Sequence, residues 1–131
     1  MADLSKSELE AMRVLWEKGA PLKPAEIQDG FSWSIDNGTL RSTLRVLMEK
    51  GHVKRKKKGK AFHYQPTVSR EGMLQSMVRR MADVFSGGSA ADLIAQLVKT
   101  EKLSPDEIEE LRRIAEEKAP KSRAKGRRKA S

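Results

Sequence analysis

Residues 36–66, DNGTLRSTLRVLMEKGHVKRKKKGKAFHYQP, decide the fold, because a helical pattern stops there at a glycine and a basic segment follows at once. Asp36 is placed to cap a helix that runs to Lys50, and Gly51 has the position of the residue that ends it. An amphipathic helix beside a lysine-rich turn has the parts needed to enter a DNA groove and to contact the neighbouring phosphates.

The residues after Gly51 predict a β-hairpin. Two strands, Val53 to Lys57 and Lys60 to Tyr64, surround a turn expected at Lys58-Gly59. Strand alternation places Phe62 and Tyr64 on the same face of the hairpin.

Two shorter helical patterns precede this segment. Ser5 and Glu8 have the spacing of a capping box, which begins a first helix that runs to Lys18. Pro24 suits the first position of a short second helix that Gly30 ends. Three short helices followed by a hairpin predict a mainly α fold, a winged helix-turn-helix, over residues 1–67.

Helical periodicity returns after Ser69 and predicts a C-terminal helical dimerisation region over residues 68–119. Gly87-Gly88 divides the pattern, and Ser89 and Ser104 each begin a further helix. The apolar stripe is too wide for a solvated helix, so it requires a partner. The side chains expected to form this contact are Met73, Leu74, Met77, Val78, Met81, Val84, Phe85, Leu93, Leu97, Ile108 and Leu111.

The net charge of +9 is unevenly distributed along the 131 residues. Basic residues number 13 against 8 acidic ones in 1–67, 8 against 10 in 68–119, and 6 against none in 120–131. The last segment has no apolar side chain larger than alanine, which predicts a disordered basic tail. Such a tail either adds non-specific affinity for nucleic acid or only solubilises the chain.

These residues resemble the penicillinase-repressor type (BlaI/MecI/CopY family) of bacterial winged-helix transcriptional repressors. The resemblance rests on LSKSELEAMRVLW at 4–16, TLRSTL at 39–44, EKG at 49–51 and FHYQP at 62–66, with a weaker match in LSPDEIEEL at 103–111. It implies a homodimer whose C-terminal helices interlock, with two winged-helix domains that bind an inverted-repeat operator in double-stranded DNA and repress transcription.

The third helix is then expected to lie in the major groove. Arg41 and Arg45 are one turn apart on its polar face, and an arginine can hydrogen-bond O6 and N7 of guanine together. The alternative is that both arginines only solvate an exposed helix face. The residues expected to contact DNA from this helix are Thr39, Arg41, Ser42, Thr43 and Arg45.

Gly38 and the hairpin lysines can each have either of two roles. Gly38 either lets the backbone approach a phosphate or leaves the helix start loosely held, since glycine costs about 1 kcal/mol relative to alanine in a helix. Lys57, Lys58 and Lys60 are expected to contact phosphates. Lysines on an exposed strand edge also guard against aggregation, and the two roles are compatible.

Several classes of function find no support in the sequence. The chain has no cysteine, which excludes thiolate metal sites and cysteine nucleophiles, and His52 and His63 alone make a poor metal site. No cofactor motif, catalytic triad or glycine-rich phosphate loop is present, so an enzyme is not expected. No apolar run is long enough to span a membrane and no secretory signal is evident, so the chain is expected in the cytoplasm.

The inducing signal is not predicted. In the penicillinase and methicillin-resistance branch a protease cuts an Asn-Phe bond, but the aligned position here is Ala95-Gln96, and the copper-responsive branch uses cysteines. An upstream protease or sensor is therefore unidentified. Two other hypotheses stay open, a non-specific nucleic-acid-binding or nucleoid protein and a regulator gated by a small molecule at the dimer interface.

Overall fold

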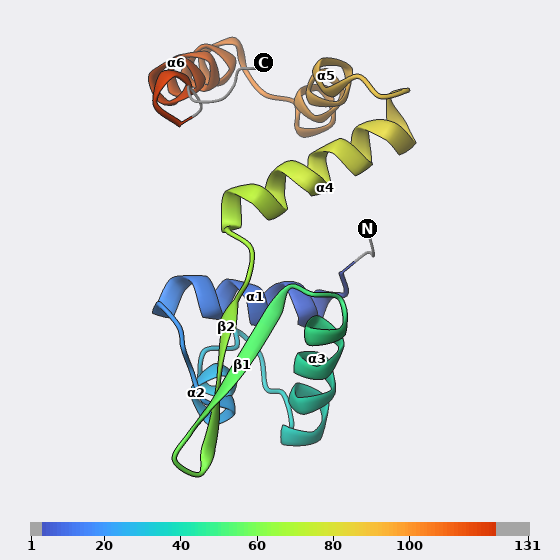
Figure 1. The fold of residues 1–131 in the computed structure, drawn as a ribbon. Coiled ribbons are helices and arrows are strands. Elements are labelled where there is room, and N and C mark those ends of the chain that lie inside the picture. Colours follow the sequence, from blue (N-terminus) through green and yellow to red (C-terminus); the bar gives the residue numbers. More distant parts are fainter. Residues whose placement is uncertain (1–3, 123–131) are drawn as a thin grey trace. The chain divides into compact units, whose positions relative to one another are not determined.

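The structure, a computed structural model, describes residues 4–122 and contains six helices and one hairpin in that range. The described chain forms two compact units, one ending at Ser76 and the other beginning at Met77. The elements, drawn in Figure 1, are α1 (Lys6–Lys18), α2 (Pro24–Asp29), α3 (Asn37–Glu49), β1 (Val53–Lys58), β2 (Ala61–Pro66), α4 (Arg70–Phe85), α5 (Ala90–Glu101) and α6 (Pro105–Ser122). This order confirms the winged helix-turn-helix.

Helix α1 begins at the predicted capping box. The Ser5 hydroxyl accepts a hydrogen bond from the Glu8 backbone N–H at 3.1 Å, and the Glu8 carboxylate accepts one from the Ser5 N–H at 3.2 Å. Gly19 ends the helix in the left-handed region, at φ 72°. The apolar face of α1 is buried and carries Ala11, Met12, Val14 and Leu15.

Helices α2 and α3 form the helix-turn-helix pair. Pro24 occupies the first turn of α2, and Asp36 caps α3 by accepting a hydrogen bond from the Thr39 N–H at 2.8 Å. Gly51 follows α3 with φ 82°, as predicted for the residue that ends it. The core between α1, α2 and α3 contains the fully buried side chains of Ile27, Leu40, Leu44 and Leu47.

A partly buried ion pair ties the start of α1 to the end of α3. Lys50 Nζ lies 2.7 Å from a Glu8 carboxylate oxygen. Burial raises the pKa of Glu8, but the hydrogen bonds from Lys50 and Ser5 outweigh it, so the pKa of Glu8 is lowered overall. Glu8 therefore serves both the cap of its own helix and the position of α3.

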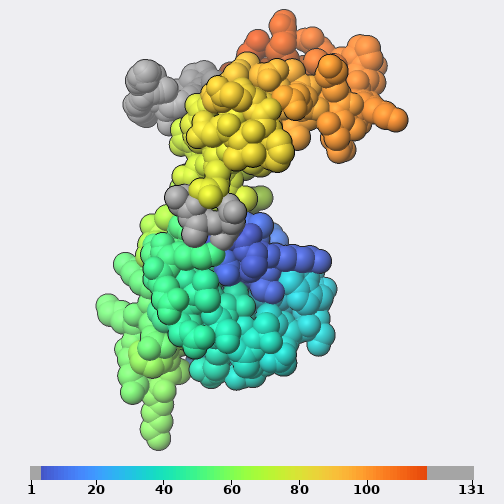
Figure 2. All heavy atoms as spheres, turned by 90° about the vertical axis from the view of Figure 1, so that its right-hand side faces the viewer, coloured from blue at the N-terminus to red at the C-terminus, as the bar shows by residue number. Residues whose placement is uncertain are grey.

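The hairpin is antiparallel and joins the rest of this unit through a short bridge. Leu22 pairs with Tyr64 through two backbone hydrogen bonds of 2.8 and 2.9 Å, so the loop between α1 and α2 lies along β2. Trp16 Nε1 also donates to the carbonyl of Val68 at 3.1 Å, which fixes the chain after β2 against α1. Figure 1 shows the hairpin beside α3, and Figure 2 shows it projecting from this unit.

The hairpin turn lies one residue later than predicted. Lys58 pairs with Ala61 inside the ladder, so the two-residue loop is Gly59-Lys60 and not Lys58-Gly59. A two-residue hairpin loop of type II′ needs a positive φ at its first position. Gly59, at φ 65°, supplies it, and this requirement decides the register.

The C-terminal helices begin at predicted caps. The hydroxyls of Ser69, Ser89 and Ser104 each accept a hydrogen bond from the backbone N–H three residues later. The sequence placed a domain boundary at 67/68, whereas the first unit includes the first turns of α4. Helix α6 continues to Ser122, past the predicted start of the tail at 120. The remainder of that tail, 123–131, lies outside the described residues.

Candidate nucleic-acid interface

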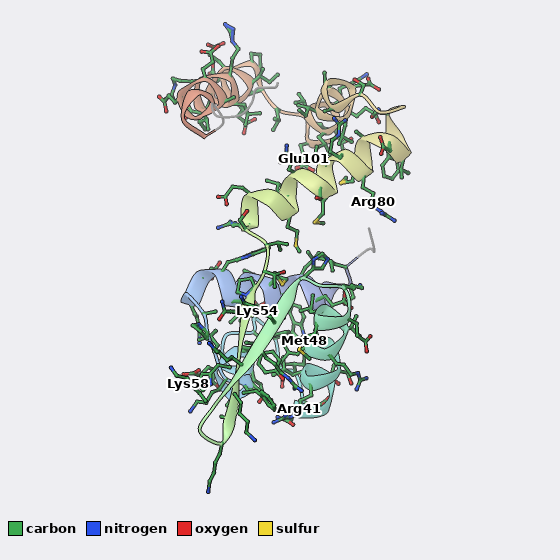
Figure 3. All side chains as sticks on the ribbon, in the orientation of Figure 1. Arg41, Met48, Lys54, Lys58, Arg80 and Glu101 are labelled. Atoms are coloured by element: carbon green, nitrogen blue, oxygen red, sulfur yellow. The ribbon has the colours of Figure 1, made fainter. Side chains whose placement is uncertain are left out.

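Helix α3 presents two different faces. Leu40, Leu44 and Leu47 are buried against the other helices. The opposite side is exposed and carries Arg41, Ser42 and Arg45 of the predicted contacts, together with the half-buried Met48. Figure 3 shows Arg41 extending from α3 on the side of the hairpin.

Thr43 does not belong to the exposed face, which corrects the prediction. Its residue is only 7% exposed, and its hydroxyl donates to the Thr39 carbonyl at 2.8 Å. Thr43 follows Leu40 by three positions and precedes Leu47 by four, so helical spacing already placed it in the core stripe. Its polar side chain tolerates burial because the backbone carbonyl accepts the hydrogen bond of its hydroxyl.

Thr39 is exposed but takes part in the helix cap. Its hydroxyl donates to Asp36 Oδ2 at 2.9 Å while its N–H donates to Oδ1. The N–H and then the hydroxyl of Thr39 lower the pKa of the Asp36 carboxyl below its ordinary value. The Thr39 methyl group and hydroxyl lone pairs remain available for contact, whereas its proton is engaged.

The wing, defined as β1, β2 and their loop, exposes its cations. Lys57, Lys58 and Lys60 are all exposed, and Figure 3 shows Lys58 toward the far end of the hairpin. Lys57 Nζ and the guanidinium of Arg55 lie 5.7 Å and 3.9 Å from the centre of the Phe62 ring. Phe62 thus supports the charged side chains along one face of the wing.

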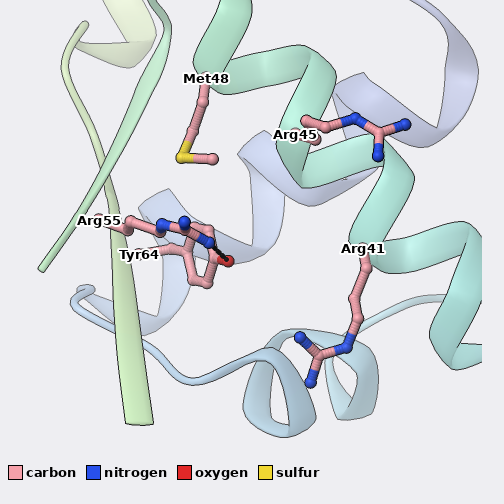
Figure 4. Close-up of a pocket in the computed structure, with 5 residues that line it drawn as sticks. All are labelled: Arg41, Arg45, Met48, Arg55 and Tyr64. Atoms are coloured by element: carbon pink, nitrogen blue, oxygen red, sulfur yellow. Dashed lines mark hydrogen bonds between the residues drawn. The ribbon is translucent and has the colours of Figure 1, made fainter. Parts of the chain in front are cut away.

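A pocket of about 210 Å³ lies between α3 and the wing. Its lining residues are Arg41, Arg45, Met48, Arg55 and Tyr64. Arg55 Nη1 donates to the Tyr64 hydroxyl at 3.1 Å, drawn as a dashed line in Figure 4, and Arg41 Nε donates to Asn37 Oδ1 at 2.9 Å. We call this feature the arginine pocket.

Arg55 and Tyr64 were not among the residues predicted to form the site. The ladder pairs Arg55 with Tyr64, so both side chains lie on the same face of the wing as Phe62. With the turn at its true position, strand alternation places both side chains beside Phe62 and would have identified them. A turn placed one residue early pairs Arg55 with a different residue and hides the contact.

Helices α4, α5 and α6 leave much of their apolar surface exposed in the single chain. Among the described residues, every exposed large apolar side chain except Trp33 and Phe62 lies on α4, α5 or α6. These side chains are Leu74, Met81, Val84, Phe85, Ile94, Leu97, Ile108, Leu111 and Ile114. Of the other predicted dimer contacts, Met77 and Val78 are half-buried.

Two predicted dimer contacts are corrected by their burial. Met73 is 5% exposed and lies in the N-terminal unit, and Leu93 is 3% exposed within the C-terminal unit. Both side chains are already covered by their own chain, so they offer no surface to a partner. Helical periodicity identifies an apolar position but does not say which neighbour covers it.

Residues 4–122 can also be considered for a metal site and for a membrane-spanning helix. No group of three or more histidine, aspartate or glutamate side chains there is arranged to hold a metal ion. None of the helices in that range combines the length and the apolar character needed to cross a membrane.

Comparison with known proteins gives matches over most of the chain. The family model described as penicillinase repressor matches residues 4–117. The methicillin resistance regulatory protein MecI of Mammaliicoccus sciuri is 33% identical over 119 residues, which cover 88% of this chain and 95% of that protein. The penicillinase repressor of Bacillus licheniformis is 29% identical over 118 residues, covering 87% and 90% of the two chains.

A solved structure is also similar in part. The solution structure of monomeric BlaI from Bacillus licheniformis, in complex with the blaP half-operator, matches 54% of this chain and 88% of that chain, with 25% identity and a TM-score of 0.47. The family model and the identity to MecI both extend over the winged helix and the C-terminal helices. The chain therefore belongs to the penicillinase repressor family.

Proposed function

We propose that the protein is a homodimeric transcriptional repressor that binds an inverted-repeat operator in double-stranded DNA. Membership of a family whose relatives are named as repressors supports the regulatory role. The observation that carries the proposal is the exposed polar face of α3 beside a wing of exposed cations. A helix fits the major groove, and cations beside it neutralise the phosphates that flank the groove.

The residues of α3 divide by the contacts they can make. Arg41 and Ser42 are exposed and are proposed to hydrogen-bond base edges. Asn37 accepts the hydrogen bond of Arg41 Nε, so the two terminal nitrogens of the guanidinium stay available for a bidentate contact. The methyl group of Thr39 suits the methyl group of thymine. Lys57, Lys58 and Lys60 of the wing are proposed to contact phosphates.

The second copy is proposed from the exposed apolar side chains of α4, α5 and α6. A valine, leucine, isoleucine, phenylalanine or methionine gains roughly 1.5–3 kcal/mol when it is fully buried, so nine such exposed positions favour association. Large apolar side chains that gather on one group of helices and stay exposed are typical of a protein interface. A two-fold dimer presents two copies of α3 and predicts an operator with two-fold symmetry.

Footprinting of the purified protein on the DNA upstream of its own gene tests this proposal. The expected result is protection of two related half-sites separated by about 10 bp or a multiple of it, in a single cooperative transition. Diffuse protection that extends with protein concentration would instead support a non-specific nucleic-acid-binding protein and reject the repressor assignment.

A further inference from the structure

The arginine pocket combines features that suit a single small anion. Three of its five lining residues are arginines, and no carboxylate lines it. Within residues 4–122, neither Arg45 nor Arg55 forms an ion pair with an acidic side chain. The positive charge of the pocket is therefore not neutralised by the described part of the chain.

The size of the pocket restricts the ligand. At about 210 Å³ it is smaller than the roughly 300–1,000 Å³ of sites that enclose drug-sized molecules. It suits one charged group attached to a larger molecule that stays outside. Guanidinium groups hydrogen-bond the oxygens of phosphate in pairs, which favours phosphate over a spherical anion such as chloride.

The polar groups of the pocket can also donate hydrogen bonds, which a phosphate requires because its oxygens are acceptors. The Tyr64 hydroxyl accepts a hydrogen bond from Arg55, and its own proton is not donated to any acceptor among the described residues. The ring of Tyr64 is buried and the Arg55 guanidinium stacks on Phe62, so both groups are held in place before a ligand binds. Arg45 is exposed on α3 and lines the pocket from that side.

We propose that the arginine pocket is a phosphate-binding site, in which Arg45, Arg55 and the Tyr64 hydroxyl hold one phosphate group between α3 and the wing. A phosphate of the DNA backbone and a free phosphate compound offer the same chemistry. The first source rests on the proposed function, whereas the second does not. If the backbone supplies it, this phosphate fixes the angle between α3 and the groove, because the site joins the helix to the wing.

The DNA arm of the test measures affinity for a random-sequence duplex at several salt concentrations, so it does not depend on operator preference. Loss of one phosphate contact changes the slope of log K against log salt by about 0.9. The double variant Arg45→Gln/Arg55→Gln removes both arginines from the one phosphate and is expected to change the slope by about 0.9. Arg45→Gln and Arg55→Gln alone are each expected to change it by no more than this, because the other arginine still faces the phosphate. Arg112→Gln, which removes the same charge from an exposed position on α6, is the matched control and should leave the slope unchanged.

The second arm uses pyrophosphate without DNA and follows the NMR signal of Arg55 Nε–H at constant ionic strength, with chloride as the reference. A saturable shift that Tyr64→Phe and Arg45→Gln weaken several-fold identifies free phosphate as a ligand. A slope change in the first arm without such a shift assigns the site to the DNA backbone alone.

Two results would overturn the proposed site. One is a double variant that matches Arg112→Gln in slope, together with a pyrophosphate response no larger than that of chloride. The other is a double variant whose slope changes by about 1.8, which would place the two arginines on different phosphates. If the wild-type protein binds no duplex at all, the proposed function fails, and the pyrophosphate arm still decides the pocket.

Discussion

Gly30 ends α2 where the chain passes close to α1, and the structure leaves no room there for a methyl group. A Cβ atom at this position would lie 2.6 Å from Val14 Cγ1 and 3.1 Å from Cγ2. The backbone itself, at φ −83° and ψ −8°, is one that alanine adopts without strain. A loss of stability in Gly30→Ala would therefore come from packing and not from backbone conformation.

The expected magnitude follows from two opposing effects. Val14 is 1% exposed, so its methyl groups are surrounded and cannot move aside, and overpacking of this kind costs about 1–3 kcal/mol. Replacement of glycine also lowers the entropy of the unfolded chain, which stabilises the protein by about 0.4–1 kcal/mol. The clash is the larger effect, so we expect a net loss of about 1–2 kcal/mol. The Gly30 carbonyl accepts a hydrogen bond from Arg13 at 2.8 Å, which opposes relief by a backbone shift.

Gly38→Ala is the matched comparison, because the substitution is identical and the surroundings are open. Its Cβ would meet only Asp36 Oδ1, at 3.4 Å, so we expect stabilisation of about 0.4–1 kcal/mol. Urea denaturation followed by circular dichroism should give a lower midpoint for Gly30→Ala and a higher one for Gly38→Ala, with equal m-values. A Gly30→Ala protein at least as stable as the wild type would refute the packing argument.

Three further predictions concern DNA contact, pH and association. Arg41→Ala should weaken binding to the operator by about 1–3 kcal/mol and binding to random DNA much less, as measured by fluorescence anisotropy; equal losses would make Arg41 a phosphate contact. The hydrogen bond from Arg13 lowers the pKa of Glu10 from 4.5 to about 2, so its contribution to stability is present above pH 4.5 and is lost as the pH falls toward 2. Urea midpoints between pH 6 and pH 3 should fall less in Glu10→Gln than in the wild type, and identical pH profiles would contradict this cause. Phe85→Asp should give a folded monomer in sedimentation velocity, since the side chain is 64% exposed in the single chain; an intact dimer would show that another face associates.

The features that the sequence predicted correctly depend on neighbours along the chain. A cap such as Asp36 and a terminating glycine such as Gly51 act over one helical turn, so their spacing is sufficient evidence. The alternation of buried and exposed positions along α3 is equally local. The polar character of Thr43 led to its selection as a DNA contact, although its spacing already placed it among the buried leucines.

The features that the sequence missed depend on contacts between distant segments. The pairing of Arg55 with Tyr64 follows from a turn whose position is set by the positive φ of Gly59, and a shift of one residue conceals it. The burial of Met73 depends on how the start of α4 packs on the N-terminal unit. Periodicity gives the apolar positions of α4 but not the surface that covers each of them.

Two copies of α3 are proposed to recognise a particular DNA sequence, and the ratio of two affinities separates this recognition from non-specific binding. The dissociation constant for the footprinted upstream duplex would be compared with that for a shuffled duplex of the same length and composition, at one physiological salt concentration. We expect a ratio of at least ~10³ in favour of the upstream duplex. A ratio near one would contradict it and would leave only non-specific attraction between the basic wing and phosphates.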